Sequence, residues 1–284
     1  MMIHTRDRRV VAILKQKQAA AAWTSPRGPK KCITKAVQDG AWAGQRCFII
    51  GGGPSLLGFD YERLRGERII AVNRAYEDVP FADILYAMDY QFYRWIIGGD
   101  LGQPALERFN NFKGIRLWFD INNVAFGPNV HYVRGFQAAH YGFPAALERG
   151  IYGGNNSGYG ALQVALLLKA NPIYLLGYDF QHAGGRSHSH SGYPRKQSEH
   201  SVFGFKQGFI DLARDITAHG FRVVNLNPQS GLRCFEFSTF DEVVNATNSG
   251  VKTVEADAAS KPGDELTPDH PGPGMPVMRG ADVL

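Results

Sequence analysis

Short apolar runs, separated by polar and glycine-rich segments, dominate the middle of the chain. Runs of this length bounded by turn-forming residues are typical of buried strands. The pattern predicts six strands, at 47–50, 69–72, 84–87, 115–119, 173–176 and 222–225.

Longer apolar stretches with helical spacing lie between these runs. The sequence predicts one helix at 157–169, after a turn-forming Gly-Gly-Asn-Asn segment, and another at 205–219. Strands that alternate with helices favour a parallel sheet covered on both faces. We therefore expect an α/β, Rossmann-like single domain with a mostly parallel sheet.

The composition changes at both ends of the chain. Residues 1–41 form an arm with one expected helix at 9–23, and residues 42–245 hold the predicted domain. The segment 246–284 is rich in Pro and Gly and has no long apolar run, so a disordered tail is expected there.

The net charge of +5 is concentrated in the arm, because residues 1–46 hold ten Lys and Arg against two Asp. A basic arm can bind nucleic acid or another phosphate-rich surface, or it can be a solvated extension.

Several protein classes are disfavoured. The apolar run at 161–168 is far shorter than the roughly 20 residues of a membrane span, and the start shows no signal peptide. The three Cys have no metal-ligand spacing. A reducing, cytoplasmic location is expected.

A glycine-rich loop, 51–55, follows the first strand and has the sequence Gly-Gly-Gly-Pro-Ser. Glycines let a ligand approach the backbone, and Pro54 or Ser55 is expected to begin a helix whose free amides favour an anion. The spacing matches neither the dinucleotide fingerprint nor the P-loop. A tight turn without a ligand is the alternative.

Polar residues also follow the other predicted strands. They are Asn73, Asp89, Asp179 and Asn227. A second glycine-rich loop, 153–158, precedes the helix at 157. Ligands of such folds bind at the carboxyl ends of the strands, so these residues predict a nucleotide site.

The segment 179–200 is long for a connection, which is typical of a binding loop. It contains His182, His188, His190 and His200. Histidine is suited to accept a proton near neutral pH. A zinc site is the alternative, but no ligand set completes it, so no metal is expected. Histidines without a role are a further alternative.

Five motifs in order carry a family resemblance. They lie at 51–56, 71–74, 156–158, 173–180 and 227–228. Over residues 47–232, the chain resembles the small bacterial sialyltransferases with CMP-linked donors, which have a GT-A-like variant of this fold. It also resembles the related domain of flagellin-modifying glycosyltransferases and archaeal hydroxymethylpterin pyrophosphokinases, a domain that phage and prophage proteins carry too.

The resemblance implies a role for each matching residue. His188, or else His190, would be the catalytic base, and Asp179, near the ribose and the acceptor, would be the other catalytic residue. The residues that would bind the donor nucleotide are Gly51, Gly52, Gly53, Pro54, Ser55, Asn73, Asn156, Ser157, Gly158, Gly177 and Asn227. The implied reaction is an inverting transfer from a CMP- or UDP-linked sugar that requires no metal or other cofactor.

The chain departs from the family at two places. Gly52 stands where the family has asparagine, and the segment 181–187 lacks the two tyrosines that assist the leaving phosphate. His182 or Arg186 could donate hydrogen bonds to that phosphate instead. A different nucleotide sugar stays open.

Two other functions stay open. One is a Mg²⁺-dependent pyrophosphokinase, with Asp89 and Asp179 as the metal candidates. The other is a non-catalytic phage accessory protein that binds nucleotides or nucleic acid. For the transferase, the expected acceptor is a glycan or a hydroxylated polymer, including modified DNA bound through the basic arm.

Overall fold

The computed structural model describes residues 30–120, 124, 126–136, 142–154, 156–181, 189–190, 193–194 and 199–245. The expected helix at 9–23 and the tail from 246 onward lie outside the described residues. The chain divides into two units between Phe240 and Asp241. The second unit contributes only the helical residues 241–245 to the description.

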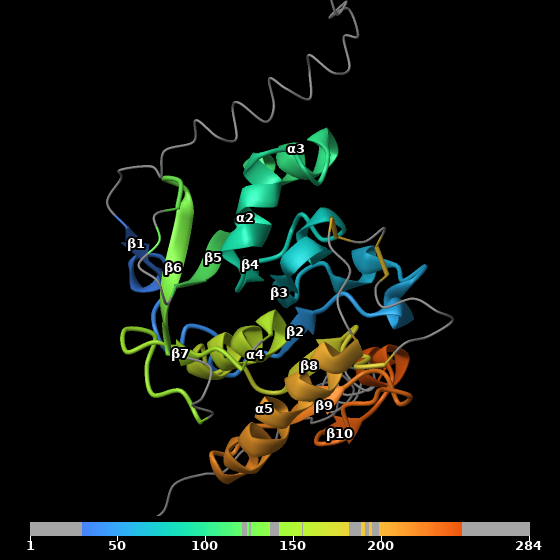
Figure 1. The fold of residues 1–284 in the computed structure, drawn as a ribbon. Helices are drawn as coiled ribbons and strands as arrows, with labels where there is room; N and C mark the ends of the chain where they lie inside the picture. Colours follow the sequence, from blue (N-terminus) through green and yellow to red (C-terminus); the bar gives the residue numbers. More distant parts are fainter. Residues whose placement is uncertain are drawn as a thin grey trace, which may run out of the picture. The chain divides into compact units, whose positions relative to one another are not determined.

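The described strands form one sheet in which every pairing is parallel. Its order is β1-β6-β5-β4-β3-β2-β8-β9-β10, with β7 beside β6 (Figure 1). The strands are β1 (Lys31–Cys32), β2 (Cys47–Ile50), β3 (Arg68–Val72), β4 (Ile84–Ala87), β5 (Ile115–Asp120), β6 (Val130–Phe136), β7 (Ile151–Tyr152), β8 (Ile173–Leu176), β9 (Val223–Asn225) and β10 (Glu236–Phe237).

Helices cover both faces of this sheet. They are α2 (Tyr90–Ile97), α3 (Gln103–Asn111), α4 (Ser157–Leu167) and α5 (Glu199–Ala218), with four short 3₁₀ turns, η1 (Ile33–Lys35), η2 (Pro54–Leu56), η3 (Tyr61–Leu64) and η4 (Asn73–Glu77). Successive side chains of a strand point to opposite faces of the sheet. On one face, Trp118 of β5 stacks on Phe92 of α2. Its neighbour Leu117 belongs to the core on the face covered by α4.

The predicted fold class is confirmed. All six predicted strands exist within two residues of their expected bounds, and α4 begins at the expected residue. Helix α5 begins six residues earlier than predicted. Strand β6, which was not predicted, has only two fully buried positions and therefore no apolar run. Lys31 and Cys32 already pair with β6, so the segment before Trp42 contributes an edge strand.

The aromatic stretch between Tyr86 and Trp95 is largely core. Phe92 and Tyr93 are buried, and both rings pack against Trp118, which also meets Phe109 of α3. These contacts join α2 and α3 to the sheet.

Helix α4 is the central helix of the fold. Ten of its eleven residues are buried. Its one buried amide side chain, Gln163, exchanges hydrogen bonds with the backbone of Tyr152 in β7 (3.0 Å and 2.6 Å). Gly160 lets the helix approach the sheet, because a Cβ there would lie 2.0 Å from the Tyr86 hydroxyl oxygen.

We expect Gly160→Ala to destabilise the protein. Alanine is the better helix former by about 1 kcal/mol, but the added methyl group meets a fully buried ring, and overpacking costs about 1–3 kcal/mol or more. The expected net loss in the free energy of unfolding is about 2 kcal/mol, measured by urea denaturation. Combining it with Tyr86→Leu, which removes the contacted atoms, should cost less than the sum of the single changes. Strictly additive losses would contradict the contact.

Candidate functional site

The candidate site lies where the chain reverses its direction of travel across the sheet. From β2 the chain proceeds through β3, β4, β5 and β6, and then returns to place β8 on the other side of β2. Loops after β2 and β8 therefore diverge, and ligands of such folds bind in that crevice. The glycine loop remains attached to β8, since Gly51 and Gly53 donate amide hydrogen bonds to the carbonyls of Leu176 (2.8 Å) and Gly177 (2.9 Å).

Asp179 connects three loops at this crevice. Its Oδ2 accepts a hydrogen bond from the Ser55 amide (2.7 Å), and its Oδ1 accepts from the Ser55 hydroxyl (2.6 Å) and the Asn227 side-chain amide (2.9 Å). The carboxylate is buried. Only glycine fits at position 53, because a Cβ there would lie 2.5 Å from Asp179 Cγ. The geometry therefore gives Asp179 a positioning role.

The expected helix after the glycine loop is absent. Pro54–Leu56 form a single 3₁₀ turn, η2. The Ser55 amide, expected to be free for an anion, is bonded to Asp179 instead. An internal carboxylate therefore takes the position that the sequence suggested for a ligand phosphate.

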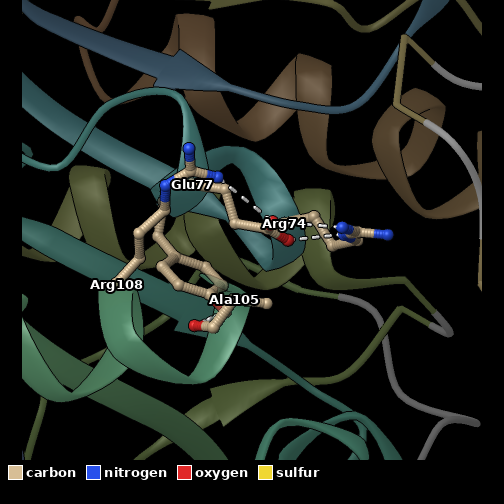
Figure 2. A network of polar contacts seen from close by, with 5 residues as sticks. Arg74, Glu77, Ala105 and Arg108 are labelled. Atoms are coloured by element: carbon tan, nitrogen blue, oxygen red, sulfur yellow. Dashed lines mark hydrogen bonds and ion pairs between the residues drawn. The ribbon is translucent and has the colours of Figure 1, made fainter. Parts of the chain in front are cut away.

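The end of β3 is fixed by a charged network. Asn73 has a positive φ of 52°, and Arg74 follows it. The Glu77 carboxylate lies between the guanidinium groups of Arg74 (Nη2–Oε2 3.0 Å) and Arg108 (3.7 Å) (Figure 2). The hydrogen bond to Glu77 raises the pKa of Arg74. Glu77 thus compensates the charge of Arg74 beside the site.

Two hydrogen bonds fix the start of α4. The Asn156 side chain caps the helix by accepting from the Tyr159 amide (2.8 Å) and donates to the Phe205 carbonyl of α5 (3.2 Å). The Ser157 hydroxyl accepts from the Met88 amide (3.1 Å). The amides of Ser157 and Gly158 lie in the first turn, where a helix leaves N–H groups without intrahelical partners and favours an anion. The start of α4 therefore has the first-turn amides that the sequence predicted for the second glycine-rich loop.

Part of the loop after β8 returns across the site. The Ser189 amide donates to the Gly52 carbonyl (2.9 Å). The Tyr193 hydroxyl bonds with Asn73 and with the backbone of Arg74, and burial raises its pKa. The His190 ring packs against Tyr193, with ring centroids 4.9 Å apart. His190 is therefore held over the carboxyl ends of β2 and β3. The expected residues His182, Arg186 and His188 lie outside the described residues, and so does the side chain of His200.

Lys206 lies at the candidate site, although no sequence motif predicted it. A Cβ on Gly231 would lie 2.9 Å from Lys206 Nζ, and the Gly231 amide donates to the Asp179 carbonyl (2.7 Å). Within the described part of the chain, the ammonium has no acidic partner.

The metal site considered for a pyrophosphokinase is not assembled by Asp89 and Asp179. Strands β4 and β8 are separated by β3 and β2, so their ends are about 14 Å apart at the usual strand spacing. One Mg²⁺ needs ligands about 2.1 Å from the ion. Over the described ranges, no three His, Cys, Asp or Glu gather as metal ligands.

Membrane insertion through a helix finds no support in the described ranges. None of the helices there combines the length and the apolar character that a span requires.

Comparisons with known proteins give structural similarities only. No family model and no curated protein matches the chain. The sialyltransferase CstII from Campylobacter jejuni with the substrate analogue CMP-3FNeuAc aligns at 16% identity and a TM-score of 0.42, over 68% of this chain and 86% of that one. Its complex with cytidine-5'-monophosphate aligns at 15% identity and a TM-score of 0.38, over 68% and 84%.

A second protein is the MAf glycosyltransferase from Magnetospirillum magneticum AMB-1, at 14% identity and a TM-score of 0.42. The alignment covers 85% of this chain and 41% of that one. The chain therefore spans less than half of that glycosyltransferase.

We expect Asp179→Ala to destabilise the protein. Hydrogen bonds to a charged group contribute about 1.5–3 kcal/mol each, and the change removes three of them while Ser55 and Asn227 regain water. The expected loss in the free energy of unfolding is about 3 kcal/mol, measured by urea denaturation. Asp211→Ala on the exposed side of α5 is the matched control and should cost less than about 0.5 kcal/mol. Equal stability of both variants would show that Asp179 does not hold the loops.

Proposed function

We propose that the protein is a glycosyltransferase that moves a sugar from a nucleotide donor to an acceptor hydroxyl. The observation that carries the proposal is the arrangement at the carboxyl edge of the sheet. The first turn of α4 and Lys206 supply positive potential there, and the segment with His190 is bonded across the glycine loop. The five family motifs in register, with CMP- and UDP-linked sugars as the implied donors, add support.

The donor phosphate binds at the start of α4 in this proposal. The amides of Ser157 and Gly158 donate to its oxygens, and Lys206 supplies the compensating charge. Arg74 does not serve this purpose, because Glu77 already holds its guanidinium. The nucleoside lies along the glycine loop, with Asn73, Gly177 and Asn227 around it.

The reaction is a direct displacement at the anomeric carbon. A histidine of the loop after β8 takes the proton of the acceptor hydroxyl, and the oxygen forms a bond to the anomeric carbon. The bond from that carbon to the phosphate oxygen breaks, and the nucleotide leaves with the electron pair. Fixed donors that meet the charge developing on the phosphate lower the barrier. Attack opposite to the leaving group inverts the configuration.

His188 and His190 are the two candidates for the base. The bond of Ser189 to Gly52 and the packing of His190 on Tyr193 support a base in this segment. Asp179 positions the glycine loop and the end of β9 around the donor. The acceptor is a glycan or another hydroxylated polymer, and the basic arm favours a polyanionic one such as modified DNA.

Nucleotide binding is the first test. A ligand at 100 times its Kd should stabilise the native protein by about 2.7 kcal/mol. We expect CMP or UDP to raise the Tm in EDTA, and Lys206→Met to weaken that nucleotide about tenfold, because a charge-assisted bond to the phosphate is lost. Titration calorimetry gives the Kd values.

Lys113→Met, at an exposed position before β5, is the control and should leave the Kd unchanged. Stabilisation by ATP only with Mg²⁺ would favour the pyrophosphokinase instead. An unchanged Tm with every nucleotide would favour a non-catalytic protein.

The histidine base is tested by turnover. Hydrolysis of the nucleotide sugar that binds, with water as the acceptor, is the readout that needs no known acceptor. Removing a general base slows a reaction by about 10²–10⁴-fold, so either His188→Ala or His190→Ala should lose activity by that factor while the nucleotide Kd is retained. Full activity of both variants would exclude a base in this segment.

A further inference from the structure

The carboxylates at the carboxyl edge of the sheet differ in what they face. Asp120 pairs with Lys30 at 2.6 Å, and Asp179 is bonded to Ser55 and Asn227. Asp89 follows β4 and is exposed. In the described structure no side chain or backbone group donates a hydrogen bond to its carboxylate. It is therefore the carboxylate that can accept bonds from a ligand.

Capping of the following helix does not account for the Asp89 carboxylate. Asp89 occupies the N-cap position of α2, but its side chain makes no capping bond. The carboxylate is thus accessible at the end of β4 and has no hydrogen-bonding partner in the described structure.

The position of Asp89 relative to the proposed phosphate site is fixed by its neighbour. The Met88 amide donates to the Ser157 hydroxyl (3.1 Å), so Asp89 lies one residue from a contact with the first turn of α4. The ends of β4 and β2 are two strand spacings apart, about 10 Å. A donor with its nucleoside along the glycine loop and its phosphate at α4 would therefore place its sugar toward Asp89.

We infer that Asp89 is a specificity residue that accepts hydrogen bonds from hydroxyls of the donor sugar and repels a sugar that bears a carboxylate. The inference rests on the proposed function and deepens it. The donor is then a nucleotide linked to a neutral sugar, and sialic acids and uronic acids are rejected. Discrimination of this kind comes from an unfavourable charge in the wrong complex as much as from good contacts in the right one.

The test is a pair of titration calorimetry comparisons. UDP-glucose and UDP-glucuronic acid differ only at C6, and CMP-N-acetylneuraminic acid is compared with CMP. We expect the member whose sugar bears a carboxylate to bind the native chain at least tenfold more weakly than the other member of its pair. Asp89→Asn keeps the shape of the side chain and removes its charge. It should narrow each ratio of Kd values at least fivefold, chiefly by strengthening the binding of the member whose sugar bears a carboxylate.

Asp211→Asn, which removes an exposed carboxylate from α5, is the control and should leave the ratios unchanged. Equal binding within the pairs, or ratios that do not move in Asp89→Asn, would overturn the inference while the proposed function stands. If UDP, CMP and their sugars all fail to bind, the proposed function fails, and the inference fails with it.

Discussion

The carboxylate of Asp179 is the interaction on which the site depends. It holds the turn after β2 through Ser55 and the turn after β9 through Asn227, while its own backbone carbonyl accepts from Gly231. Three loops from different parts of the chain thus share one buried acceptor.

Because the Asp179 carboxylate packs against it, the glycine loop differs from a phosphate-binding loop. In a phosphate-binding loop, the glycines open the backbone to the ligand. Here Gly53 is required because Asp179 occupies the space next to it, and the amide of Ser55 is already engaged. In the proposed function, the negative charge of the donor is therefore compensated elsewhere, by the start of α4 and by Lys206.

The sheet could be predicted from the sequence because its central strands are buried on both faces and read as apolar runs. Strand β6 lies near the edge, has mixed exposure and gave no such run. The environment of the glycine loop could not be predicted, because Ser55 and Asp179 are 124 residues apart in the chain. The same holds for the contact of Tyr193 with Asn73 and for the position of Lys206. Local motifs identified the loops of the site, and only the fold showed which polar groups compensate one another.

Lys206 and Asp89 have no partner of opposite charge in the described structure, and they lie at the ends of different strands. Lys206 lies near the ends of β8 and β9, where Gly231 meets Asp179, and Asp89 lies at the end of β4. The segment with Ser189 and Tyr193 crosses the ends of β2 and β3 between them. In the proposed function, the donor has its phosphate at the start of α4 with Lys206 and its sugar toward Asp89. A base carried by the segment with His190 would then have to reach the bond between that phosphate and that sugar.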